Sequence, residues 1–262
     1  MLKKTVLVVV LLLIATNLWA VKTLDVSAGR HNLTWDAPRF NPSNEPYLAS
    51  ASSEDEVCIF CHTPHGGTLN TPLWNRALPV ATGFTHYTSA TLSGYMTGPG
   101  MATREVKPES ILCMSCHDGS AALNSIVNSS NRTGAAPDNS TAYVLGFGPF
   151  PGPQIGGAPN PAGGWSPYID VSNNLSDDHP ISFSYSQSYT SKGGGLQTVA
   201  DARAAGLRFF GPDTATGNFV ECSSCHDPHV NYQAGVGGDA EYTPFLVTPN
   251  TGSALCLGCH IK

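Results

Sequence analysis

The chain has 262 residues, 12% of them charged, and a formal net charge of −6. This acidic balance disfavours nucleic acid as a partner, because the phosphate backbone demands a basic surface. The 27 glycines and 20 prolines follow no collagen repeat and predict many turns and few long elements. We therefore expect a mostly irregular fold, low in secondary structure, with a few short strands and a poor conventional core.

The N-terminus has the pattern of a secretory signal peptide over residues 1–20. Lys3 and Lys4 form a basic start, an apolar run follows, and Ala20 is a small residue at a plausible cleavage site. The run is short for a membrane span, and a retained N-terminal anchor is the alternative. Cleavage leaves residues 21–262, with 11 basic and 19 acidic residues and a net charge of −8. Because no second apolar run follows, we expect an exported chain without a membrane span.

Eight cysteines fall in four C-x-x-C pairs, and a histidine follows every pair. The four runs read CIFCH, CMSCH, CSSCH and CLGCH. With 9 histidines in 262 residues, this placement would arise by chance on the order of once in a million. Four disulfides, two zinc sites of four thiolates each, or exposed redox pairs are the alternatives, but none of them explains the histidines.

C-x-x-C-H is the attachment signature of c-type haem. The two thiols form thioether bonds to the vinyl groups of the haem, and the imidazole that follows reaches the iron. The sequence therefore predicts four covalently attached c-type haems. The predicted attachment residues are Cys58, Cys61, Cys113, Cys116, Cys222, Cys225, Cys256 and Cys259, and the predicted proximal iron ligands are His62, His117, His226 and His260.

Five histidines remain for the distal faces of four irons. Two of them, His65 and His229, occupy equivalent places in CHTPH and CHDPH. Two histidines on one iron hold their Cα atoms roughly 13 Å apart, given a metal–nitrogen bond near 2 Å. Three residues span at most about 10–11 Å, and the intervening proline ends any helical turn. We therefore expect neither histidine to bind the haem beside it, so each serves a different haem or none.

The other three are His31, His86 and His179. His179 lies in NLSDDHPISFSY, where Asp177 or Asp178 could accept the second ring N–H and orient the ligand. His31 lies in AGRHNLTW, near the mature N-terminus. His86 lies in an alternating pattern typical of a short strand, where a histidine can simply face solvent. We predict His31, His65, His179 and His229 as the distal ligands, with His86 as the alternative to His31.

Methionine is the other common axial ligand, and it raises the reduction potential. Met96 and Met101 lie in a glycine-rich stretch and are candidates of this kind. With five histidines available, the composition favours haems with two histidine ligands and low potential.

The four motifs are unevenly spread along a single predicted domain. Residues 53–122 carry the first two motifs, residues 123–165 form a Gly/Pro-rich loop, and residues 166–262 carry the last two. We expect one-turn helices around the motifs and a short helix in QTVADARAAG that Gly206 could cap. The chain should wrap around a line of four haems, which supply much of the apolar core.

These residues resemble a known family. CHTPHGG followed by PLWNR, then LCMSCHDGSAAL, LSDDHPISFSY, CSSCHDPH and a terminal ALCLGCH are similar to the doubled-CXXCH multihaem cytochromes. Within that group the chain resembles the tetrahaem cytochromes that polymerise into extracellular nanowires, the outer-membrane cytochromes of the E and S type. The resemblance implies an irregular fold, haems with two histidine ligands, and a histidine of one subunit that binds a haem in the next. His65 is the best match for that histidine, with His31 as the alternative.

Three hypotheses follow for the function. The first is an exported, non-enzymatic tetrahaem cytochrome that carries electrons, as the subunit of an extracellular or cell-surface filament with other copies of itself and redox-partner cytochromes. The second is a periplasmic shuttle or the cytochrome subunit of a reductase complex. The third, a multihaem nitrite or metal reductase, needs an open iron position, and five spare histidines for four haems argue against one.

Overall fold

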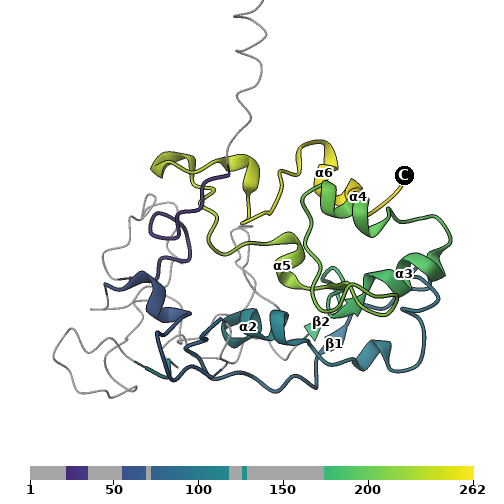
Figure 1. Cartoon of the computed structure of the whole chain (residues 1–262), viewed down its shortest axis with the longest axis horizontal. Coiled ribbons are helices and arrows are strands. Elements are labelled where there is room, and N and C mark those ends of the chain that lie inside the picture. Colours follow the sequence, from purple (N-terminus) through teal and green to yellow (C-terminus); the bar gives the residue numbers. More distant parts are fainter. Residues whose placement is uncertain (1–21, 35–54, 69–71, 118–125, 129–173) are drawn as a thin grey trace, which may run out of the picture.

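The computed structural model describes residues 22–34, 55–68, 72–117, 126–128 and 174–262 (Figure 1). The signal peptide predicted over residues 1–20 lies outside these ranges. So does the predicted loop at 123–165, apart from residues 126–128. Within the described ranges, no helix is both long and apolar enough to cross a membrane.

The described helices are short, and several consist of a single turn. The α-helices are α2 (Pro108–His117), α3 (Tyr185–Lys192), α4 (Val199–Ala204), α5 (Cys222–Cys225) and α6 (Ala254–Leu257). The 3₁₀-helices are η1 (Val57–Phe60), η2 (Met101–Thr103), η3 (Ala234–Val236), η4 (Ala240–Tyr242) and η5 (Thr251–Ser253). Each of the four cysteine motifs contains or overlaps one helix. At the second motif the helix, α2, has ten residues rather than the one turn expected, and it starts at Pro108, whose missing N–H is harmless in a first turn.

The part of the chain that the structure describes has four strands of two residues each, which form two separate pairs. β1 (Thr85–His86) runs parallel to β2 (Asn174–Leu175), and β3 (Phe183–Ser184) runs antiparallel to β4 (Phe219–Val220). Strands of this length cannot form a layer that buries a continuous apolar face. The strands therefore connect distant segments locally and do not organise the molecule.

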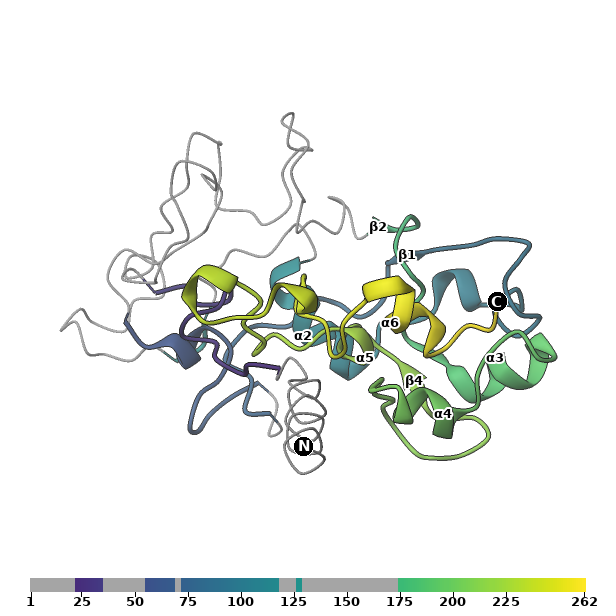
Figure 2. The ribbon, with the colours of Figure 1, turned by 90° about the horizontal axis from the view of Figure 1, so that it is seen from above.

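The helices of the four motifs follow one another across the molecule in sequence order. η1 lies at one side, in blue, and α2, α5 and α6 come after it in both views (Figures 1 and 2). α2 and α5 are in contact. The motifs therefore form a line, although long stretches of sequence separate them.

Within the described ranges, buried apolar side chains form three small clusters rather than one core. The first surrounds Phe60, the second Met114 and the third Tyr185. A motif cysteine packs against each cluster: Cys61, Cys222 and Cys259 respectively. The apolar packing is thus concentrated beside the cysteine motifs.

Capping residues explain where α3 and α4 begin and end. The hydroxyl of Thr198 accepts a hydrogen bond from the Asp201 N–H at the start of α4, and Gly206 follows its end with a φ of 96°. The sequence predicts a helix in the region of α4 but none at α3, whose residues are mostly polar. α3 begins because the Ser184 hydroxyl accepts from the Gln187 N–H, and Gly193 ends it in the left-handed conformation.

A buried carboxyl group ties α2 to the start of α5. Glu221 is only 1% exposed, and its Oε2 accepts hydrogen bonds from the hydroxyls of Ser110 at 2.6 Å and Ser182 at 2.9 Å. The Ser110 hydroxyl in turn accepts from the Cys222 N–H at 3.0 Å. Oε1 of Glu221 is buried without a partner. Burial raises the pKa of Glu221 to about 7, although the two serine hydrogen bonds oppose the rise.

In the wild-type protein we expect the free energy of unfolding to fall as pH rises, because Glu221 ionises. We predict that Glu221→Gln abolishes this fall. The pKa of Glu221 lies higher in the folded protein than in the unfolded chain, so its contribution is fully present below about pH 4.5 and lost by about pH 7. That loss is worth about 3 kcal/mol at most. Unfolding in denaturant, followed by circular dichroism from pH 4 to 8, measures it. The exposed Glu105→Gln, with the same charge change, should keep the wild-type pH profile; an unchanged profile in Glu221→Gln would contradict the prediction.

Candidate haem-binding sites

The four motifs define four candidate sites, numbered in sequence order. Site 1 is Cys58, Cys61 and His62; site 2 is Cys113, Cys116 and His117; site 3 is Cys222, Cys225 and His226; site 4 is Cys256, Cys259 and His260. At sites 1, 3 and 4 the histidine N–H donates to the carbonyl of the first cysteine, at 2.7, 3.0 and 2.9 Å. At site 2 the motif is the last part of α2. A helical turn places residues i and i+3 on one face, so both thiols of a pair can reach one ligand.

Thiols of successive sites interact with one another. Burial, followed by the nearby Cys116, raises the pKa of Cys61 to about 12. A hydrogen bond between Cys113 and Cys222 joins site 2 to site 3 and raises the pKa of Cys113. Burial, followed by the nearby Cys259, raises the pKa of Cys225 to about 12. None of the eight cysteines, all of which lie in the described ranges, is joined in a disulfide.

Three motif histidines each face a histidine from elsewhere in the chain. The ring centroids of His62 and His229, of His117 and His31, and of His260 and His179 are all 6.3 Å apart. An imidazole nitrogen binds a metal at about 2.0–2.1 Å, so the centroids of two rings on opposite sides of one metal lie about 6.3 Å apart. The three pairs have the separation that a shared metal requires, which is wider than that of two rings in direct stacking contact.

The donor set fits a haem iron better than a zinc ion. A structural zinc site needs four protein ligands. In the described part of the chain, no group of three or more His, Cys, Asp or Glu side chains could hold a metal ion. A haem supplies four nitrogens itself and leaves two axial positions, which two opposed imidazoles would fill. The paired histidines and the unbridged cysteine pairs are therefore suited to haem.

Hydrogen bonds at Nδ1 fix the tautomer of several of these imidazoles. His31, His62, His179 and His226 each place Nδ1 2.8–3.2 Å from a proline carbonyl oxygen, of Pro228, Pro72, Pro180 and Pro244 respectively. A carbonyl only accepts, so Nδ1 carries the proton and Nε2 keeps its lone pair for a metal. Desolvation also lowers the pKa of His31 to about 4 and lowers that of His179, and both shifts favour the neutral form that a metal ligand needs.

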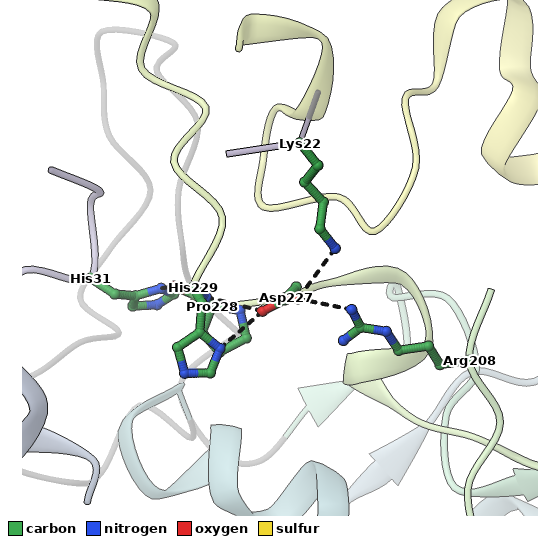
Figure 3. Close-up of polar contacts among 6 residues, drawn as sticks. All are labelled: Lys22, His31, Arg208, Asp227, Pro228 and His229. Atoms are coloured by element: carbon green, nitrogen blue, oxygen red, sulfur yellow. Dashed lines mark hydrogen bonds and ion pairs between the residues drawn. The ribbon is translucent and has the colours of Figure 1, made fainter. Parts of the chain in front are cut away.

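His229 differs, because its Nδ1 donates to a carboxylate. Asp227 Oδ1 lies 3.0 Å from this nitrogen and also accepts the backbone N–H of His229. The other oxygen, Oδ2, forms ion pairs with Lys22 at 3.3 Å and Arg208 at 2.9 Å, and Figure 3 shows the three partners converging on Asp227. The hydrogen bond from His229 and the ion pair with Arg208 lower the pKa of Asp227, so this side chain is ionised.

Site 3 lacks a second histidine within the chain. All nine histidines are described, yet none places its ring opposite His226. His65 is exposed and faces no histidine ring either. The side chain of Asn128 donates to the carbonyls of His65 and Gly66, at 3.2 and 3.3 Å, and so braces the loop that carries His65. As the reach of three residues predicts, His229 faces a different motif from the one beside it.

Three expectations from the sequence need correction. His86 does not face solvent: it is 2% exposed, and its Nε2 contacts the Arg104 carbonyl at 2.9 Å, so it is not arranged as an axial ligand. The ring of His179 contacts the carbonyl of Pro180 rather than Asp177 or Asp178, because the extended chain at the proline brings that carbonyl closest. Met96, a weaker candidate ligand, is buried among Phe183, Tyr185 and Val220.

Sequence reasoning missed three side chains that position the imidazoles. Phe245 stacks on His31 with centroids 4.2 Å apart, and Trp74 packs edge-on against His62 at 5.7 Å. Asp227, described above, is the third. Trp74 in PLWNR and Asp227 in CHDPH stand in motifs that the sequence already singles out. Phe245 gives no such signal, since its position depends on a left-handed φ of 58°.

Comparison with known proteins provides no further assignment. No family model matches the chain, and no curated protein matches it either. The resemblance to multihaem cytochromes therefore rests on the motifs and their order.

The planes of the paired imidazoles predict two classes of EPR signal. The planes lie 10° apart for His62 and His229, but 89° apart for His31 and His117 and 76° apart for His179 and His260. Near-perpendicular axial planes keep the iron d orbitals closer in energy and give a more anisotropic low-spin ferric signal than parallel planes. We expect one ordinary rhombic signal from site 1 and highly anisotropic signals from sites 2 and 4. Removing His229 should abolish the rhombic signal of site 1 and leave the highly anisotropic signals of sites 2 and 4; a single signal class in the wild type would contradict the pairing.

Proposed function

We propose that this chain is an exported tetrahaem c-type cytochrome that carries electrons. The observation that carries the proposal is the set of three histidine pairs, each with one motif histidine and a centroid separation of 6.3 Å. The four C-x-x-C-H motifs, with their thiols on helical turns, support covalent attachment. Each haem, when bound, supplies a reversible one-electron iron couple, and we assign no bond chemistry to the protein.

The residues of the chain bind, orient and space the haems. Cysteine pairs would hold them, opposed imidazoles would close the two axial positions, and proline carbonyls would orient the imidazoles through Nδ1. Cys113 of site 2 forms a hydrogen bond with Cys222 of site 3, and Cys116 and Cys259 act electrostatically on the thiols of Cys61 and Cys225, so each site influences the next in sequence order. Haems bound at the four sites would follow one another in the order of the motif helices, and they would supply a path for electrons along that line.

We further propose that the protein forms a filament in which His65 completes site 3 of the next subunit. His226 has no histidine opposite it within the chain, and His65 is an exposed imidazole with no partner ring. His31, the alternative, faces His117 and is hydrogen-bonded to Pro228, so it is already used within its own chain. One missing ligand and one spare imidazole per chain match each other in a head-to-tail polymer.

The same observation at site 3 favours a second candidate function. An iron with one histidine and an open position is what a multihaem reductase needs for its substrate. The count of spare histidines argued against an open position, but within one chain only three of the four motif histidines have a partner. The two functions differ in one property: His65 of another subunit closes site 3 in the filament, whereas site 3 stays open in the reductase.

Electron microscopy and absorption spectroscopy of His65→Gly test the filament. We expect the wild-type protein, matured in a host that attaches c-type haem, to form ordered filaments with four low-spin haems. His65→Gly should give dispersed particles with one of the four haems high-spin. Added imidazole should restore the low-spin spectrum of that haem but not the filaments, because free imidazole closes the iron position without joining subunits.

The His65→Gly experiment also separates the alternatives. Filaments that persist in His65→Gly with four low-spin haems would contradict the ligand assignment. Dispersed wild-type particles with one high-spin haem would support the reductase, and dispersed particles with four low-spin haems would support a periplasmic shuttle. An absence of covalent haem would overturn all three.

A further inference from the structure

Neutral groups accept the Nδ1 hydrogen bonds of four candidate ligands. His31, His62, His179 and His226 each contact the carbonyl oxygen of a proline. Among the five candidate ligands whose Nδ1 contact the structure describes, only His229 contacts a charged group, the carboxylate of Asp227. Among the described Nδ1 contacts, the one at His229 of site 1 therefore stands apart, because a charged group lies behind the imidazole.

The carboxylate of Asp227 is held firmly in place for this contact. Its side chain is 7% exposed, and Oδ1 accepts both the ring N–H and the backbone N–H of His229. Lys22 and Arg208 hold Oδ2 on the other side. The His229 side chain is 54% exposed, so its ring orientation depends on this contact rather than on close packing.

A carboxylate behind an imidazole makes that imidazole a stronger donor to a metal. A more electron-rich axial ligand stabilises the oxidised iron and lowers the reduction potential, and hydrogen bonding to the ligand is one of the protein's means of tuning it. The opposite ligand at site 1, His62, has only the neutral carbonyl of Pro72 behind it. Any such effect at site 1 therefore comes from the His229 side.

Lys22 and Arg208 act in the opposite direction, since a positive charge near the iron favours the reduced state. Neither touches the imidazole: both bind Oδ2, whereas the ring N–H of His229 binds Oδ1. Arg208 is 45% exposed, so water and salt screen its charge. The direct hydrogen bond to the ligand should therefore dominate the two more distant charges.

We propose that Asp227 is a positioning residue that lowers the reduction potential of site 1 by polarising His229. The inference rests on the proposed function, because it requires a haem between His62 and His229. Asp227 would then influence the direction of electron flow through the potential of site 1, in addition to holding a loop in place.

Redox titration of Asp227→Asn tests this. Asparagine keeps an oxygen that can accept the ring N–H of His229, so the substitution removes the charge and preserves the geometry. We expect one of the four one-electron waves to move to higher potential while the other three stay in place, with all four haems low-spin. A purely structural role would leave all four waves unmoved or would convert one haem to high spin, and either result would overturn the inference.

Two further variants identify the wave and its cause. His229→Met should move the site 1 wave upward, since a thioether ligand raises the potential. In that background Asp227→Asn should have a much smaller effect, because methionine offers no N–H to the carboxylate. If Asp227→Asn shifts the site 1 wave equally with His229 and with Met at position 229, Asp227 acts through its charge alone. That result would overturn the proposal.

If Asp227→Asn does not fold, Arg208→Gln provides a second test of whether Asp227 lowers the potential of site 1. It removes a positive charge from Oδ2 and leaves the hydrogen bond to His229 intact, so the same wave should move to lower potential. A shift to higher potential, or a shift of another wave, would count against the inference. A preparation that contains no covalent haem would instead overturn the proposed function itself.

Discussion

The four residues from His226 to His229 are the constraint on which the candidate sites depend. His226 belongs to site 3, Asp227 orients His229, the carbonyl of Pro228 orients His31, and His229 faces His62 of site 1. Pro228 and His229 form a turn, which the Val230 N–H closes by donating to the Asp227 carbonyl at 3.0 Å, so the side chains of this segment point to different sites rather than to one. Three of the four sites therefore share one short piece of backbone, and none of the three can be rearranged alone.

Buried polar contacts, rather than a large apolar core, connect the described parts of the chain. Glu221 joins Ser110 of α2 to Ser182 at the edge of β3, and Asn75 donates to the carbonyls of Ile59 and Asn128. The three apolar clusters are small, and each adjoins a motif cysteine. In the proposed cytochrome, covalent haem would extend these clusters, so folding and haem attachment would be coupled, as metal binding and folding are in other small-core proteins.

Local chemistry was predictable from the sequence, whereas long-range pairing was not. The C-x-x-C-H spacing predicts the thiol pairs, and the reach of three residues correctly separates His229 from the motif histidine beside it. Nothing in the spacing says that His229 faces His62, because that pairing depends on how irregular segments cross. His86 was misjudged for the same reason: its alternating neighbours predict the short strand β1, but the carbonyl that buries it comes from Arg104.

The candidate sites differ in the groups around their histidines, and these differences would give the proposed conductor a direction. Site 1 has a carboxylate behind one ligand, while site 3, the third in the line, lacks its second histidine within the chain. His65 lies three residues from His62, the site 1 ligand, so in the proposed filament the imidazole that closes site 3 of one subunit extends from the site 1 end of the next. The subunit junction would then place the carboxylate-tuned site 1 beside site 3 of the neighbouring subunit. Joining subunits and orienting the potentials would thus depend on the same end of the molecule.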